Sequence, residues 1–182
     1  IPFFIYAGEL MNQSGIAERL VKFAHSLLAR VRGGLGLVNV SSSMMFGAIS
    51  GSAVASASAM GSTLIPMMKK QGYDADYAVN VTATAATTGL LIPPSHNMII
   101  YAISAGGGLS IGSLFLAGIV PGILLGLGLM LVTYLVAVKR GYPSGTFPGW
   151  SQVLRHFIGA LPGLFTVFII LGGILSGVFT AT

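Results

Sequence analysis

The sequence predicts an all-α, polytopic membrane protein whose core is a re-entrant helical hairpin followed by a discontinuous transmembrane helix. Of its 182 residues, 54% are hydrophobic and 7% are charged, whereas soluble domains carry about 25% charged residues. The chain also contains 26 glycines and 8 prolines, which in apolar surroundings indicate broken or closely packed helices. This composition leaves too little polar surface for a domain that faces water.

The composition excludes several classes of function. The chain has no cysteine, which excludes a disulfide scaffold, a thiolate metal site and a cysteine nucleophile. The net charge of +5 does not require a nucleic-acid partner, because the basic residues lie at the margins of apolar runs, as the positive-inside rule describes. Aromatic residues interleaved for base stacking are also absent. We therefore expect the lipid bilayer as partner, and no nucleic acid.

Residues 1–15 are expected to be the end of a transmembrane helix. Because Ile1 opens inside an apolar run and Thr182 ends without a polar tail, we expect the chain to be an internal piece of a longer protein. Residues 16–32 repeat apolar side chains at helical spacing, with most charged residues elsewhere. This pattern predicts an interfacial amphipathic connector helix whose basic residues lie among anionic headgroups on the cytoplasmic side.

Residues 33–70 are predicted to form the re-entrant helical hairpin. The uncharged stretch between Arg32 and Lys69 would make a single helix of roughly 54 Å, against a hydrocarbon core of about 30 Å. Basic residues at both ends place both ends in the cytoplasm. The middle of the stretch, Ser50–Ser58, is small and hydroxylated, so we expect it at the turn. Such a tip requires burial in protein or a watery cavity.

Residues 75–105 are predicted to form a broken transmembrane helix. Asp74 is placed to cap its start. Gly89 and the Pro93-Pro94 pair interrupt it, because successive prolines remove amide donors and force the preceding residues out of the helical region. Apolar residues then resume and complete the segment.

The rest of the chain predicts two further membrane segments. Residues 113–139 are predicted to be a conventional transmembrane helix, which is uncharged over residues 113–138 and ends in the basic pair Lys139-Arg140. Residues 140–158 are expected to be a cytoplasmic loop and an interfacial helix. Residues 159–182 are expected to be the start of the next transmembrane segment.

The two breaks define a candidate site. A hairpin tip and an unwound loop expose backbone groups that are costly in a bilayer unless they bind a ligand. Carbonyls and serine hydroxyls suit a small cation, and freed helix N-termini suit an anion. No Asp, Glu, Lys or Arg lies at residues 33–68 or 77–138, and proton coupling usually needs an intramembrane titratable group. The sequence therefore favours a secondary transporter of an anion coupled to Na⁺.

The order of these motifs resembles a known family. The run SGSAVASASAMGSTLIPMMKKQGYDADYA, then TGLLIPPSHNMIIYA, LFLAGIVPGILLGL and GGILSGVFTAT, is similar to the large membrane (M) subunit of the tripartite ATP-independent periplasmic (TRAP) transporters. The match covers nearly the whole chain. The resemblance implies an elevator-type transporter with two inverted repeats, of which this fragment contains the core of the first.

The resemblance also implies partners and a location. The partners are a small membrane subunit of the same transporter, separate or fused, and a periplasmic substrate-binding protein. The binding protein would deliver an organic carboxylate, such as a sugar acid, a sialic-acid-like compound or a C4-dicarboxylate. The implied location is the bacterial or archaeal cytoplasmic (inner) membrane, as a multi-pass protein.

Similarity with the first Na⁺ site of the family implies ligands at the two breaks, and Na⁺ is the coupling ion that we expect. The candidate Na⁺ ligands, through hydroxyl and backbone oxygens, are Ser50, Ser52, Gly89, Ile92 and Pro94. The candidate substrate-binding residues are Ser52, Ser56, Ser95, His96 and Asn97. The family often has an acidic residue in place of Ser56 and an apolar pair in place of His96 and Asn97. The donors of that pair suit a hydroxylated sugar acid better than a plain dicarboxylate.

Three alternatives stay open, although we expect no enzyme. A Na⁺-coupled anion symporter of a related elevator family would work without a binding protein. An intramembrane serine hydrolase would pair Ser50 or Ser52 with His96, but GAISG departs from the G-x-S-x-G pattern. A passive channel or structural subunit is the third. A serine-reactive fluorophosphonate probe identifies a hydrolase, and gradient-dependent uptake separates a symporter from a channel.

Overall fold

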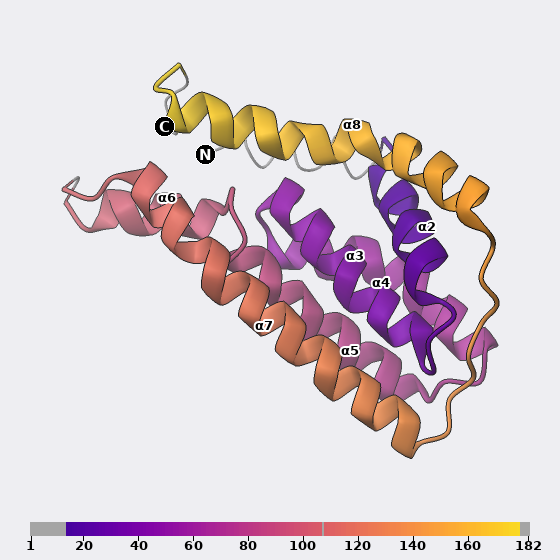
Figure 1. Cartoon of the computed structure of the whole chain (residues 1–182). Helices are drawn as coiled ribbons and strands as arrows, with labels where there is room; N and C mark the ends of the chain where they lie inside the picture. The colour runs from indigo at the N-terminus through magenta and orange to yellow at the C-terminus, as the bar shows by residue number, and fades with distance from the viewer. Residues whose placement is uncertain (1–13, 107, 179–182) are drawn as a thin grey trace.

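The computed structural model describes residues 14–106 and 108–178, which form helices joined by short loops (Figure 1). The expected transmembrane helix end in residues 1–15 therefore lies almost wholly outside the described residues. In chain order the helices are α2 (Ile16–Leu28), α3 (Gly34–Ser50), α4 (Ala53–Lys70), α5 (Ala75–Ala86), the 3₁₀ helix η1 (Thr87–Leu90), α6 (His96–Ser104), α7 (Ile111–Lys139) and α8 (Trp150–Leu175).

The predicted all-α fold is confirmed, and two apolar helices fit the predicted membrane protein. The described part of the chain contains no β-strand, and two of its helices, α7 and α8, are long and apolar enough to cross a membrane. At 1.5 Å per residue, their 29 and 26 residues exceed a hydrocarbon core of about 30 Å. The described residues leave most of the apolar stretch of each of these helices unburied.

Helix α3 lies at the centre of the bundle, between α7 on one side and α8 on the other (Figure 1). Fourteen of its 17 residues are buried, which explains why it is apolar on all faces rather than on one stripe. One cluster of apolar side chains joins α3 to α2, α4 and α8. A second cluster joins α3 to α5, α7 and the turn between α4 and α5.

The hairpin turn is shorter than we expected from the sequence. Helix α3 ends at Gly51, whose φ of 60° is left-handed, and α4 begins at Ala53. The predicted turn, residues 50–58, is thus mostly the first turns of α4. The reason is that alanine favours helix strongly and the small hydroxylated side chains pack inside it: the Ser56 hydroxyl donates to the Ser43 carbonyl of α3 at 3.4 Å. That both hairpin ends face the cytoplasm stays a prediction.

The segment that follows the hairpin is interrupted around its two prolines. Helix α5 passes into η1, and α6 begins at His96. The peptide bond between Pro93 and Pro94 is cis. Asp74 occupies the N-cap position of α5, but its side chain makes no capping hydrogen bond. Its carboxylate instead accepts hydrogen bonds from Tyr142 and Arg140, each at 2.7 Å, and the second of these joins two charged groups.

The other helix boundaries differ in two places from the sequence-based expectation. The surface helix predicted for residues 16–32 ends at Leu28. Helix α8 is continuous from Trp150 to Leu175, where we expected an interfacial helix and a separate membrane segment from residue 159. Pro162 lies inside α8 without ending it, because neighbouring groups in a membrane helix can satisfy the backbone that a proline frees.

Candidate functional site

A pair of glycines joins the hairpin to the broken helix. A Cβ atom on Gly47 would lie 2.5 Å from the Cα atom of Gly89, and one on Gly89 would lie 2.9 Å from the Cα atom of Gly47. Only residues without side chains permit this approach. Gly47 precedes the hairpin tip by one helical turn, and Gly89 lies at the start of the break. The contact therefore holds the tip against the break.

The hairpin tip carries two serines with different roles. The Ser50 side chain is buried, and its hydroxyl lies 3.4 Å from both the amide nitrogen and the carbonyl oxygen of Ser52. These distances are at the upper limit for hydrogen bonds, so the hydroxyl keeps acceptor capacity. The Ser52 hydroxyl caps α4 by accepting from the Ala55 amide at 3.3 Å. The tip thus presents two hydroxyl oxygens.

The break leaves two backbone carbonyls without helical donors because of its two consecutive prolines. In an α-helix, the carbonyls of Gly89 and Leu90 would accept from the amides of residues 93 and 94, but both are prolines and have none. The amides of Leu91 and Ile92 turn back to the Thr88 carbonyl, at 3.1 and 3.0 Å. Carbonyl oxygens of the break are consequently left available to a ligand.

The restart of the helix provides donors beside these acceptors. The first amides of α6 have no acceptor within the helix. Ser95, the N-cap residue, is fully buried, and its hydroxyl has no hydrogen-bond partner among the described residues. A buried hydroxyl without a partner is costly, so a ligand that bonds to it would be stabilised.

The break loop is also supported from behind by α7. A Cβ on Gly118 would lie 2.6 Å from the Leu91 carbonyl oxygen, and one on Gly122 would lie 2.8 Å from the Ile92 side chain. These glycines let the loop lie directly on the α7 backbone. The position of the carbonyls is therefore determined by α3 on one side and α7 on the other.

The structure brings together only part of the predicted set. Ser50 and Ser52 share the tip, which the Gly47 contact holds to Gly89. Ser56 lies one helical turn after Ser52, and its buried hydroxyl donates to the Ser43 carbonyl of α3. Asn97 is exposed on the first turn of α6, and in the described residues no hydrogen bond links it to Ser52. Sequence reasoning missed Gly47 and Thr88. The signal that could have pointed to Gly47 is a glycine inside an apolar helix, where small residues mark close helix contacts.

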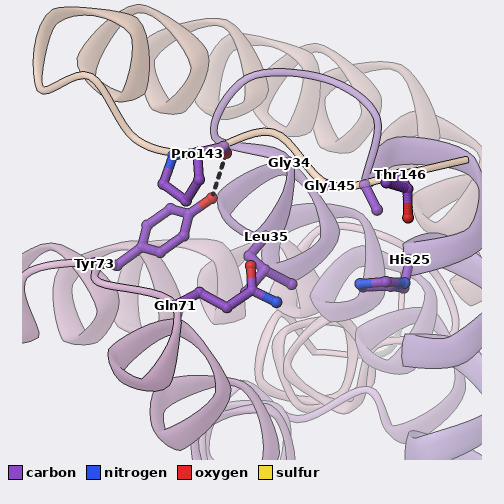
Figure 2. A pocket seen from close by; sticks show the side chains of 9 residues that line it. His25, Gly34, Leu35, Gln71, Tyr73, Pro143, Gly145 and Thr146 are labelled. Carbon is purple, nitrogen blue, oxygen red and sulfur yellow. Dashed lines mark hydrogen bonds between the residues drawn. The ribbon is translucent and has the colours of Figure 1, made fainter.

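A cluster of charged side chains lies away from this site, at the opposite end of the hairpin. There Arg140 bonds to Asp74 and Asp76, at 2.7 and 3.4 Å. The hydrogen bonds from Tyr142 and then Arg140 lower the pKa of Asp74, and the hydrogen bonds of Arg140 with Tyr142, Asp76 and Asp74 raise the pKa of Arg140. A pocket of about 160 Å³ lies near this cluster (Figure 2). The Tyr73 hydroxyl donates to the Pro143 carbonyl beside it at 3.5 Å.

The fold and the site define a class of protein. A helical hairpin packed against a proline-broken helix, beside two helices that are long enough to span a bilayer, is the arrangement of discontinuous helices found in secondary transporters. The chain belongs to the DctM component family of the tripartite ATP-independent periplasmic transporters, whose profile matches residues 1–182. This match confirms the resemblance seen in the motifs.

Individual relatives align over the whole chain. The C4-dicarboxylate TRAP transporter large permease protein DctM of Vibrio cholerae is 44% identical over 100% of this chain and 40% of its own length. The sialic acid TRAP transporter permease protein SiaT of Haemophilus influenzae is 43% identical, with 29% of its length covered. The 2,3-diketo-L-gulonate large permease protein YiaN of Escherichia coli is 38% identical, with 42% covered. The chain thus spans less than half the length of each.

Proposed function

We propose that this chain forms the first Na⁺ site and one half of the carboxylate site of a Na⁺-coupled secondary transporter. One observation carries the proposal: the Gly89 and Leu90 carbonyls lack helical donors, and the Gly47 contact holds them against the hairpin tip. Unwound backbone carbonyls at membrane depth coordinate Na⁺ in transporters of several folds. The tip adds the Ser50 and Ser52 hydroxyls, which supply further neutral oxygen atoms.

An anionic substrate would be held at the restart of the helix. The first amides of α6 and its positive dipole end favour an anion, and the unpartnered Ser95 hydroxyl lies on the same turn. The relatives are named for C4-dicarboxylates, sialic acid and 2,3-diketo-L-gulonate, which are all organic carboxylates. Among these we favour a hydroxylated sugar acid, because His96 and Asn97 add hydrogen-bonding side chains.

The remaining parts of the transporter follow from family membership. We infer a small membrane subunit, separate or fused, and a periplasmic binding protein that delivers the carboxylate. We further infer a multi-pass protein of the bacterial or archaeal inner membrane. In it α3 and α4 form a re-entrant hairpin that moves with α5 and α6 by an elevator mechanism.

Uptake in proteoliposomes tests the proposal. The full-length transporter with its binding protein should accumulate substrate only with an inward Na⁺ gradient. Ser52→Ala should weaken apparent Na⁺ affinity several-fold, because it removes a tip oxygen. Ser62→Ala is the matched control, since the Ser62 hydroxyl bonds to the Ala59 carbonyl within α4.

Four results would overturn the proposal. Uptake driven by a proton gradient alone, or equal Na⁺ constants for both serine variants, would contradict the cation site. Uptake that needs no binding protein would indicate a symporter of a related elevator family. Labelling by a fluorophosphonate would indicate a hydrolase.

A further inference from the structure

A basic pocket lies where α2 crosses the first half of α8. It has a volume of about 150 Å³ and is lined by Arg19 and Lys22 of α2 and by Arg155, His156 and Gly159 of α8. The two helices are held together beside it, with the rings of Phe23 and Phe157 5.4 Å apart. In Figure 1, α2 lies directly against this part of α8. The pocket is separate from the hairpin tip and the helix break.

The positive charge of the pocket is only partly balanced by the described part of the chain. Neither Arg19 nor Arg155 forms a salt bridge there, and only Lys22 has a carboxylate partner, Glu18, at 2.7 Å. The Nδ1 atom of His156 is buried and has no hydrogen-bond partner within the described residues. Three cationic side chains around one small cavity repel each other. An anion in the cavity would relieve that repulsion and accept the unused hydrogen bonds.

The surroundings of the pocket indicate its depth. Trp150, which begins α8, is 77% exposed, and exposed tryptophan is typical of the headgroup region. Arg155 follows it by about 8 Å along the helix axis. Beyond Arg155 the exposed face of α8 becomes apolar, with Ile158, Leu161 and Phe165. A basic pocket thus adjoins an apolar surface, which together fit a molecule with an anionic head and hydrocarbon chains.

We propose that this pocket binds the headgroup phosphate of an anionic glycerophospholipid, whose acyl chains lie along the exposed face of α8. A soluble anion would use the basic side chains but not the adjoining apolar surface. Basic pockets between helices near the cytoplasmic face are suited to anionic lipid headgroups. The inference needs only the membrane setting of the family, so it is independent of the proposed Na⁺ and carboxylate sites.

Lipid binding to the full-length transporter tests this site. After delipidation in detergent, binding of phosphatidylglycerol and of phosphatidylcholine is measured by native mass spectrometry. We expect a preference for phosphatidylglycerol. Arg155→Gln should weaken its binding about fivefold, the equivalent of about 1 kcal/mol for one basic residue at an anionic surface. Arg30→Gln removes an exposed charge outside the pocket and should leave binding unchanged.

A second variant fills the pocket without changing its charge. A Cβ on Gly159 meets no atom within 4 Å, so Gly159→Leu extends into open space and should weaken phosphatidylglycerol binding at least as much as Arg155→Gln. Gly172→Leu is the matched control, because Gly172 also lies in α8 with no atom within 4 Å of a Cβ. Substrate uptake gives a separate readout of the fold.

Several outcomes would overturn the inference. Equal binding of phosphatidylglycerol and phosphatidylcholine would show that the site does not select an anionic headgroup. Equal effects of Gly159→Leu and Gly172→Leu on phosphatidylglycerol binding would show that the lipid does not bind in the pocket. Full displacement of the lipid by millimolar inorganic phosphate would show that the pocket takes a soluble anion and that the apolar face of α8 contributes nothing.

Discussion

Replacing Gly47 by alanine should push the hairpin tip away from the helix break. The added Cβ would lie 2.5 Å from Gly89 Cα and 3.0 Å from the Gly89 amide nitrogen, whereas carbon atoms in contact lie about 3.5–4.0 Å apart. The two backbones must therefore separate by about 1 Å. Because the obstacle is backbone rather than a flexible side chain, the strain is expected to cost about 1–3 kcal/mol.

The matched control for this change is Gly61→Ala in α4. There the added Cβ meets the Ile65 and Thr82 side chains at 3.5 and 3.7 Å, which are ordinary contacts. Both glycines lie inside helices, so both variants gain about 0.8–1 kcal/mol of helix propensity. The difference between them isolates the backbone clash, and Gly47→Ala should be less stable than Gly61→Ala by about 1–3 kcal/mol.

The same displacement should weaken the apparent affinity for Na⁺ more than the apparent affinity for substrate. An ion–carbonyl contact comparable with a hydrogen bond to a charged group contributes about 1.5–3 kcal/mol. Its loss would raise the apparent Na⁺ constant about 10- to 150-fold. Uptake as a function of Na⁺ in proteoliposomes and thermal unfolding in detergent measure the two effects. If Gly47→Ala and Gly61→Ala have equal unfolding midpoints and equal Na⁺ constants, the glycine contact does not position the site.

Two further predictions address the substrate and the surface helix. Asn97→Ala should weaken substrate binding by about 1–3 kcal/mol, roughly five- to 150-fold, with little change in Na⁺ affinity. The control Asn80→Ala, at an exposed position of α5, should change neither affinity. An unaltered substrate constant for Asn97→Ala would show that Asn97 is not part of the substrate site. Burial, and then the charge of His156, lowers the pKa of His25 from 6.5. The unfolded chain then binds more protons, so the stability contribution is complete above about pH 6.5 and is lost as the pH falls through the lowered pKa of the folded state. Thermal unfolding across this range should show an acid sensitivity that His25→Gln lacks, and equal sensitivity in both proteins would refute it.

Local and composition-based features were predictable. The length of the uncharged stretch and its basic flanks indicated two helices in place of one, and Pro93 and Pro94 indicated a break. Both depend on properties of consecutive residues. The predicted turn at Gly51 was too long because we interpreted the serine- and alanine-rich residues 50–58 as a loop. Buried small residues of this kind pack well inside helices.

Features that depend on distant parts of the chain were not predictable. The contact of Gly47 with Gly89 requires knowledge of how two helices cross. Asp74 has the sequence position of a helix cap, but Arg140, 66 residues further on, takes its carboxylate. The substrate role of Ser56 and the roles of the tip and break residues in Na⁺ binding stay predictions.

The segment that connects α2 to α3 is hydrogen-bonded to the loop that follows α7, and these contacts close this end of the bundle. The Gly33 amide donates to the Pro143 carbonyl at 3.1 Å, and the Gly145 amide donates to the Ala29 carbonyl at 2.7 Å. The Ala137 methyl group of α7 also fills the space beside Gly33.

These contacts have a consequence for biogenesis. The two sides of the closure are separated by about 100 residues of chain, which a ribosome takes about 5–20 s to synthesise. During that interval α3 has left the ribosome without α7, which packs against it in the finished fold. The face of α3 that α7 covers must therefore be sheltered by lipid or by the insertion machinery until α7 arrives. A delay in α7 insertion should leave that face of α3 exposed to membrane proteases.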